Sequence, residues 1–221
     1  LGDVRLEPAP GQWGKLPTVG KRVVDQAANR AEVPLRFEME GIAYRVRVEP
    51  DGDALAVTVD LERPLPKECV GRAGFNLELF PTADFGKTYH LGRTDGVFPR
   101  QGNGPNVSDA SAVWATPRAE GPVFTAAPED PLRRLTIESL SGNLRFFDGR
   151  STETNGWFLV RSLIRAGATK GAVRWRITPN AVASWRRPPV IGISQIGYHP
   201  LQDKRAVIEL DPRTDAFPPP G

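Results

Sequence analysis

The stretch "GIAYRVRVEPDGDALAVTVDLE", residues 41–62, contains the clearest strand pattern in the sequence. Each half alternates apolar and polar residues, as in antiparallel strands with one buried face and one solvated face. Between the halves, "PDGD" at 50–53 supplies the turn residues of a β-hairpin. The shared apolar face would hold Ile42, Tyr44, Val46, Val48, Leu55, Val57, Val59 and Leu61. The stretch therefore predicts two antiparallel strands joined by a tight turn.

The same alternation recurs in short segments along the chain, such as "GFNLELFP", "LRRLTIESL" and "GAVRWRITPN". The 221 residues include 22 Gly and 22 Pro, which favour many turns and short strands over helices. We expect an all-β fold, an antiparallel β-sandwich of jelly-roll type, over residues 34–180. Residues 1–33 are expected to form an irregular N-terminal arm, and residues 181–189, with Pro188 and Pro189, a stiff linker.

Composition excludes several kinds of chemistry. The chain has one cysteine, Cys69, and two histidines, His90 and His199, which are far apart and lack companions at metal-ligand spacing. No Gly-x-Ser-x-Gly motif or phosphate-binding loop occurs. We expect no cofactor. Asp and Asn residues in turns could supply oxygen ligands to a structural calcium ion, but the sequence contains no calcium-binding loop motif.

The charge and hydropathy of the chain indicate whether nucleic acid or a membrane is an expected partner. The net charge is +3, and no run of five to eight Lys or Arg residues is present. Arginines instead alternate with apolar residues, as on the solvated face of a sheet. We therefore expect no nucleic acid as partner, with polyanion binding as the weaker alternative. No apolar run approaches the length of a membrane helix, so no membrane partner is expected.

A second hairpin pattern stands near the end of the sequence, in "VIGISQIGYHPLQDKRAVIEL", residues 190–210. Its "SQIGYHP" and "DKRAVIEL" resemble the opening of the immunoglobulin-like domain that precedes the catalytic barrel in glycoside hydrolase family 9, the cellulase family. The family pattern is Asn-Gln-x-Gly-Tyr-x-Pro, then Lys-x-Ala and a strand; Ser194 replaces the Asn. The resemblance implies that residues 190–221 are the truncated start of an Ig-like domain.

The resemblance also implies a setting for the residues before it. They would form an N-terminal accessory module of a bacterial hydrolase, secreted or periplasmic, with any signal peptide removed. The family's Asp-Ala-Gly-Asp motif is missing, so we expect no catalytic residue and no hydrolysis from these 221 residues. The expected function is binding of β-glucan or a related plant polysaccharide. The alternative is a structural module that packs on and stabilises the downstream Ig-like and catalytic domains.

Residues 81–121 show almost no periodicity and are expected to form a long functional loop. Sugar rings stack on aromatic rings, and their hydroxyl groups bind planar polar side chains. The loop contains both kinds of residue, and Trp13 and Trp157 are further aromatic candidates. The predicted carbohydrate-binding residues are Trp114, Tyr89, Phe98, Arg100, Gln101, Asn103, Asn106, Asp109 and Trp13.

Overall fold

A computed structural model of the chain describes residues 2–7, 15–102, 104–108, 113–151, 156–183 and 185–211. Contacts divide the chain into two units, Leu1–Asn180 and Ala181–Gly221. The division lies where the sequence predicts the linker to begin. The regular structure is nearly all antiparallel β-sheet, so the predicted fold class is confirmed.

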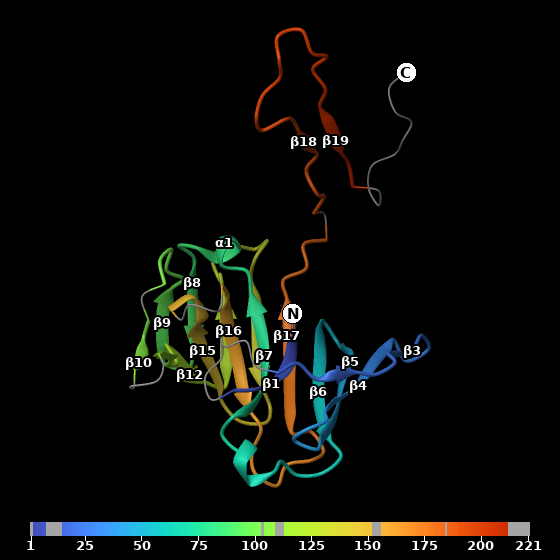
Figure 1. Cartoon of the computed structure of the whole chain (residues 1–221), viewed down its shortest axis with the longest axis vertical. Helices are drawn as coiled ribbons and strands as arrows, with labels where there is room; N and C mark the ends of the chain where they lie inside the picture. The colour runs from blue at the N-terminus through green and yellow to red at the C-terminus, as the bar shows by residue number, and fades with distance from the viewer. Residues whose placement is uncertain are drawn as a thin grey trace. The chain divides into compact units, whose positions relative to one another are not determined.

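The smaller sheet of the first unit has five antiparallel strands in the order β1-β7-β16-β15-β12 (Figure 1). Strands far apart in sequence are neighbours in it, since β1 pairs with β7 and β7 with β16. The bounds are β1 (Gly2–Leu6), β7 (Ala73–Leu79), β16 (Phe158–Leu163), β15 (Leu144–Asp148) and β12 (Ala119–Gly121).

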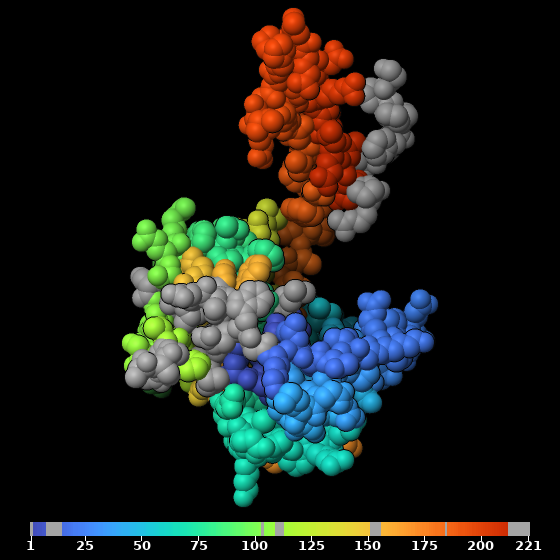
Figure 2. All heavy atoms as spheres, viewed as in Figure 1, coloured from blue at the N-terminus to red at the C-terminus, as the bar shows by residue number. Residues whose placement is uncertain are grey.

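The larger sheet has ten strands, nine of them in the order β2-β4-β5-β6-β17-β14-β13-β8-β9, while β3 also pairs with β4. Figure 2 shows the β3–β4 end of this sheet, in blue, projecting beyond the rest of the unit. The bounds are β2 (Thr18–Val19), β3 (Val23–Asp25), β4 (Arg30–Phe37), β5 (Ile42–Asp51), β6 (Ala54–Leu61), β17 (Val173–Pro179), β14 (Leu135–Ser139), β13 (Val123–Ala126), β8 (Thr88–Leu91) and β9 (Thr94–Val97).

The chain passes repeatedly from one sheet to the other, as in a jelly roll: β6 is followed by β7, β7 by β8, and β14 by β15. A separate two-stranded sheet joins β10 (Asn106–Ser108) to β11 (Val113–Ala115). The helical elements are one turn of α-helix, α1 (Pro81–Asp84), and the 3-10 turns η1 (Lys67–Cys69) and η2 (Gly149–Ser151).

The hairpin predicted from residues 41–62 is confirmed as β5–β6. Val46 lies opposite Val59 and Val48 opposite Val57, in the register that puts all four on the core side. Leu55 is the exception: it stands beside the turn and is 43% exposed. The alternation of side chains thus fixes the faces of both strands, except where the hairpin ends.

The described parts of residues 1–33, namely 2–7 and 15–33, do not form the expected irregular arm. β1 pairs with β7 across five residue pairs, and β2 and β3 both pair with β4. Val4 of β1 is almost completely buried, and the hydroxyl group of Tyr44 donates a hydrogen bond of 2.9 Å to Asp3 Oδ1. The segment lacks a clear period because β1 is an edge strand whose pairing partner lies about seventy residues away.

Residues 81–121 are not a structureless loop either. They contain α1 and the strands β8 to β12, each three or four residues long. Strands this short contain too few positions for a two-residue period to be visible. The chain is nevertheless well bonded here, since the Phe98 N–H donates to Lys87 O at 2.9 Å and the Gly86 N–H to Phe98 O at 2.9 Å.

The core between the two sheets is rich in aromatic rings. Trp175 of β17 is almost completely buried, meets Phe75 edge-on at 4.9 Å between ring centroids, and donates its indole N–H to Ser162 Oγ at 2.8 Å. This burial agrees with the alternation of "VRWRI" (173–177), which puts Val173, Trp175 and Ile177 on one face of the strand. The indole donor is satisfied inside the core, as a buried polar group requires.

The second unit contains one antiparallel pair, β18 (Val190–Gly192) with β19 (Val207–Glu209), among its described residues. The hydroxyl group of Tyr198 accepts a hydrogen bond from the Ser194 N–H at 3.2 Å and donates one to Arg205 O. Tyr198 therefore closes the connection between the strands, with its hydroxyl bonded to backbone. Gly197 has φ +84°, a left-handed conformation that favours glycine in this turn.

Candidate functional site

Two of the predicted sugar-binding rings belong to the core. Tyr89 is 3% exposed and Phe98 is 0% exposed, and their ring centroids lie 5.3 Å apart. Phe98 also meets the rings of Phe124, Phe146 and Phe158 at centroid distances of 6.4, 5.4 and 4.9 Å. Rings enclosed on every side cannot stack on a sugar, so the prediction is wrong for Tyr89 and Phe98. The sequence shows that both residues are aromatic, but it does not show whether their rings point into the core or toward solvent.

The remaining predicted residues fall into three groups. Asn106 is exposed on β10, and Trp114 is half-buried on β11, so the structure brings these two into one hairpin. Arg100 and Gln101 are both exposed and follow the core residue Phe98. Trp13, Asn103 and Asp109 lie outside the residues that the structure describes.

Arg150 holds the segment that carries Arg100 and Gln101. Its guanidinium donates to Pro99 O at 2.7 Å and to Arg100 O at 3.0 Å. It also makes a two-pronged ion pair with Asp148, both contacts at 2.8 Å, and lies over the Phe158 ring at 4.4 Å from its centroid. The backbone at 99–100 is therefore fixed to the end of β15, while the Arg100 side chain reaches solvent.

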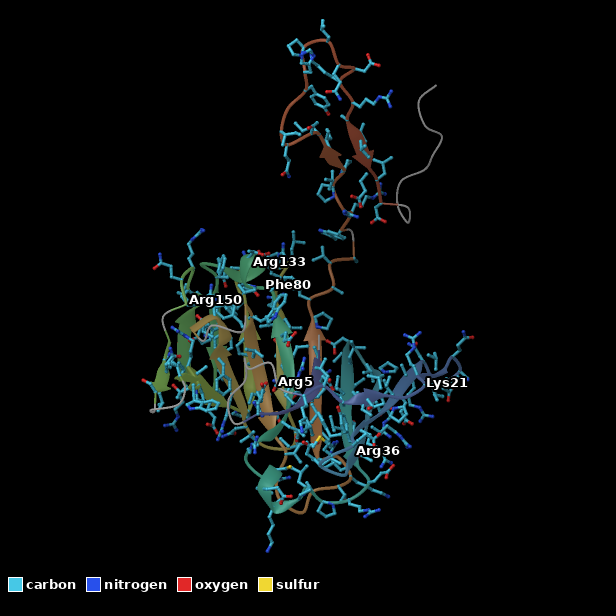
Figure 3. The ribbon with its side chains drawn as sticks, viewed as in Figure 1. Arg5, Lys21, Arg36, Phe80, Arg133 and Arg150 are labelled. Atoms are coloured by element: carbon cyan, nitrogen blue, oxygen red, sulfur yellow. The ribbon has the colours of Figure 1, made fainter. Side chains whose placement is uncertain are left out.

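An exposed ring pair, Phe80 with Trp157, stands at the same end of the sandwich as α1. Phe80 directly follows β7 and is 64% exposed, while Trp157 directly precedes β16 and is half-buried. Their ring centroids lie 4.5 Å apart at an interplanar angle of 82°. Figure 3 labels Phe80, Arg133 and Arg150 together at this end of the first unit. An exposed face of one ring braced by the edge of another is a rigid apolar platform.

The ring pair belongs to the outer face of the smaller sheet. β7 and β16 pair in a register that puts Phe158 opposite Leu79, so Phe80 and Trp157 come next along the two strands. Glu78, two residues before Phe80, shares this face and forms an ion pair with Arg5 at 3.8 Å. A sugar ring on Phe80 would thus have a carboxylate on the same strand.

Phe80 is not among the residues predicted to bind sugar, although the sequence pattern around it indicates that its ring is exposed. In "AGFNLELF" (73–80), the apolar residues alternate from Phe75 to Leu79, which assigns Phe80 to the opposite, polar face. A large aromatic residue on a polar face is the kind of exposed group that merits attention.

The larger sheet has a groove of about 850 Å³ on its outer face, over β5, β6 and β17. Side chains of both charges line it, among them Arg45, Arg47, Asp60, Lys170, Arg174 and Arg176. Several of these are paired: Arg45 Nε lies 3.0 Å from Glu32 Oε1, and Arg176 contacts Asp51 and Asp53 at 3.1 and 2.7 Å. The groove has no exposed aromatic ring among its described lining residues, because Tyr44 and Trp175 turn their rings to the core.

Candidate catalytic and metal-binding groups are sparse in the described part of the chain. No cluster of three His, Cys, Asp or Glu residues could hold a metal ion there. Cys69 is buried, and burial raises the pKa of its thiol, which disfavours the reactive thiolate. No helix among the described residues has the length and hydropathy of a membrane span.

No protein-family model, curated protein or solved structure matches this chain.

Proposed function

We propose that the first unit is a non-catalytic carbohydrate-binding module of a family 9 glycoside hydrolase, acting on β-glucan or a related plant polysaccharide. The observation that carries the proposal is the exposed ring pair. Phe80 offers an apolar surface to the C–H face of a pyranose ring, and Trp157 holds Phe80 in place. Glu78 lies two residues before Phe80, and Arg150, labelled at this end in Figure 3, holds the backbone of Arg100. Glu78, Arg100 and Gln101 are the polar groups proposed to bind sugar hydroxyls.

The second unit supports the assignment to a hydrolase through its local geometry. "SQIGYHP" forms the connection between two antiparallel strands, as the family pattern requires, with Gly197 and Tyr198 in the roles described above. We propose that this hairpin opens an Ig-like domain and that a catalytic domain follows in the parent enzyme, which would be exported. In that setting the module would raise the effective concentration of the catalytic site at its substrate.

One observation favours the alternative, a structural module that binds no sugar. Ile191 and Ile208 lie opposite each other on β18 and β19 and are 65% and 61% exposed. Two short strands bury too little apolar surface to be stable alone, so this pair needs a protein surface to pack on. Such a surface could be supplied by domains of the same parent protein.

Replacing Phe80 by Ala tests the proposal. We expect binding to barley β-glucan or cellohexaose to weaken about tenfold, because an aromatic contact contributes roughly 0.5–1.5 kcal/mol beyond the area it buries. Affinity electrophoresis with the soluble polysaccharide and calorimetry with the oligosaccharide would measure the effect. Since Phe80 is 64% exposed, the variant should remain folded.

Met39→Ala is a matched control, because Met39 is an apolar side chain 82% exposed in the turn between β4 and β5. It should bind like the parent protein. Mobility that is unchanged in every glucan, xylan and mannan tested, for the parent protein as well as the variants, would contradict sugar binding and favour the structural module.

A further inference from the structure

The groove on the larger sheet contains a row of three side chains that the proposed glycan platform does not use. Thr58 of β6 lies opposite Arg47 of β5 on one side and opposite Arg174 of β17 on the other. Side chains opposite each other on neighbouring strands stand about 4.5–5.5 Å apart at Cβ. Thr58 therefore lines the groove between two arginine residues, and Lys170, near the start of β17, lines it as well.

Two cations that line the groove, Arg174 and Lys170, are not neutralised by the described part of the protein. In the described ranges, neither Arg174 nor Lys170 has a carboxylate oxygen within 4.0 Å, whereas Arg45 and Arg176 are closely paired. Arg47 likewise forms ion pairs with Glu49 at 3.5 Å and with Asp60 at 3.7 Å, so the protein itself neutralises it. Asp60 is also engaged elsewhere, since its Oδ1 accepts the Gly171 N–H at 2.6 Å. Positive charge therefore remains available to a ligand beside Thr58.

We propose that this groove is a second binding site, which takes the carboxylate groups of an acidic, uronic-acid-containing polysaccharide. Arg174 and Lys170 bind the carboxylate, and Thr58, which lies opposite Arg174, donates its hydroxyl to one of the oxygens. The volume of about 850 Å³ lies within the roughly 300–1,000 Å³ that is usual for ligand sites. The site is on a different sheet from the ring pair and does not depend on it.

The mixed charge of the groove selects this ligand over a nucleic acid. Glu49, Asp51 and Glu62 also line the groove, and they would repel a backbone that carries a phosphate at every nucleotide. Toward a polysaccharide the same carboxylates are useful, because they accept hydrogen bonds from hydroxyl groups. A uronic-acid polysaccharide carries about one carboxylate for every one or two sugar rings, together with many hydroxyl groups. Its carboxylates match the cationic lining residues, and its hydroxyls match the lining carboxylates.

Arg174→Gln in the full chain tests this site against Arg145→Gln, which removes the same charge from β15 of the other sheet. We expect Arg174→Gln to weaken binding to polygalacturonate at least fivefold and to flatten its salt dependence, as measured by affinity electrophoresis and by calorimetry with oligogalacturonates. Arg145→Gln should change the affinity less than twofold. Thermal unfolding of both variants would verify that they are folded.

Three results would overturn the proposal: no binding of the parent protein to polygalacturonate, equal losses in both variants, or binding to single-stranded DNA that exceeds binding to polygalacturonate. These outcomes can be distinguished from a failure of β-glucan binding at the Phe80–Trp157 ring pair. Loss of barley β-glucan binding in Phe80→Ala, with polygalacturonate binding retained, would support two independent sites. A fourth result would also overturn the proposal: loss of β-glucan binding in Arg174→Gln, because the groove would then not select carboxylates.

Discussion

Replacing Phe98 by Ala is expected to lower the free energy of unfolding by about 3–5 kcal/mol, the usual cost of removing a large buried ring. Phe98 is 0% exposed and contacts four other rings between the sheets. The surrounding rings belong to four different strands and cannot collapse together into the cavity. Urea denaturation followed by circular dichroism would measure the change, with Phe98→Leu as the milder variant if the alanine protein does not fold.

Phe80→Ala is the natural comparison for this stability measurement. Its ring is mostly exposed, so its removal should cost less than about 1 kcal/mol. Phe98→Leu, when folded, should bind β-glucan with the affinity of the parent protein. Phe80→Ala should bind it about tenfold more weakly. The reverse pattern, a stable Phe98 variant that has lost glycan binding, would restore Phe98 as a sugar-binding residue and contradict the core described here.

Replacing Arg150 by Ala is expected to destabilise the protein by about 3–5 kcal/mol, because it breaks the ion pair with the buried carboxylate of Asp148. The Asp148 side chain is 0% exposed, and Arg150 binds it with two short contacts while covering the Phe158 ring. The same guanidinium also holds the backbone at Pro99 and Arg100. Loss of Arg150 should therefore loosen the segment that carries Arg100 and Gln101 as well.

Equilibrium denaturation would measure the effect, and hydrogen exchange at residues 99–101 would report the local loosening. Arg145→Ala provides a control, since the Arg145–Glu120 pair is at the surface, with side chains 38% and 42% exposed. Its loss should cost less than about 1 kcal/mol. The double variant Arg150→Met/Asp148→Asn should recover part of the stability. A fully stable Arg150→Ala protein would contradict the anchoring role.

The parts of the fold that could be predicted were those that local patterns specify. In residues 41–62 the alternation and the "PDGD" turn agree, and the β5–β6 hairpin forms in the expected register. β1 could not be predicted, because its stability comes from pairing with β7, far away in sequence. The short strands β8 to β12 were missed for a related reason: three or four residues show no period, and their pairing is set by tertiary contacts.

The candidate site could be predicted only in part. Composition identified aromatic and planar polar residues as sugar-binding groups, but a loop without periodicity does not reveal which rings face the core. Phe98 was thus placed on the wrong side, while Arg100 and Gln101 are at the surface as expected. The groove could not be found at all from sequence, because Arg47, Thr58 and Arg174 come from three strands that only the sheet order brings together.

Sugar binding at the Phe80–Trp157 ring pair can be observed residue by residue in a ¹H–¹⁵N NMR titration of the full chain with cellohexaose. Binding at the ring pair predicts shifts of the Trp157 indole N–H and of the Arg100 and Gln101 amides. The Trp175 indole, bonded to Ser162 inside the core, should stay unchanged and serves as an internal reference. If the Trp157 indole resonance did not shift, and the other shifts were absent or came from residues elsewhere, sugar binding at this ring pair would be contradicted.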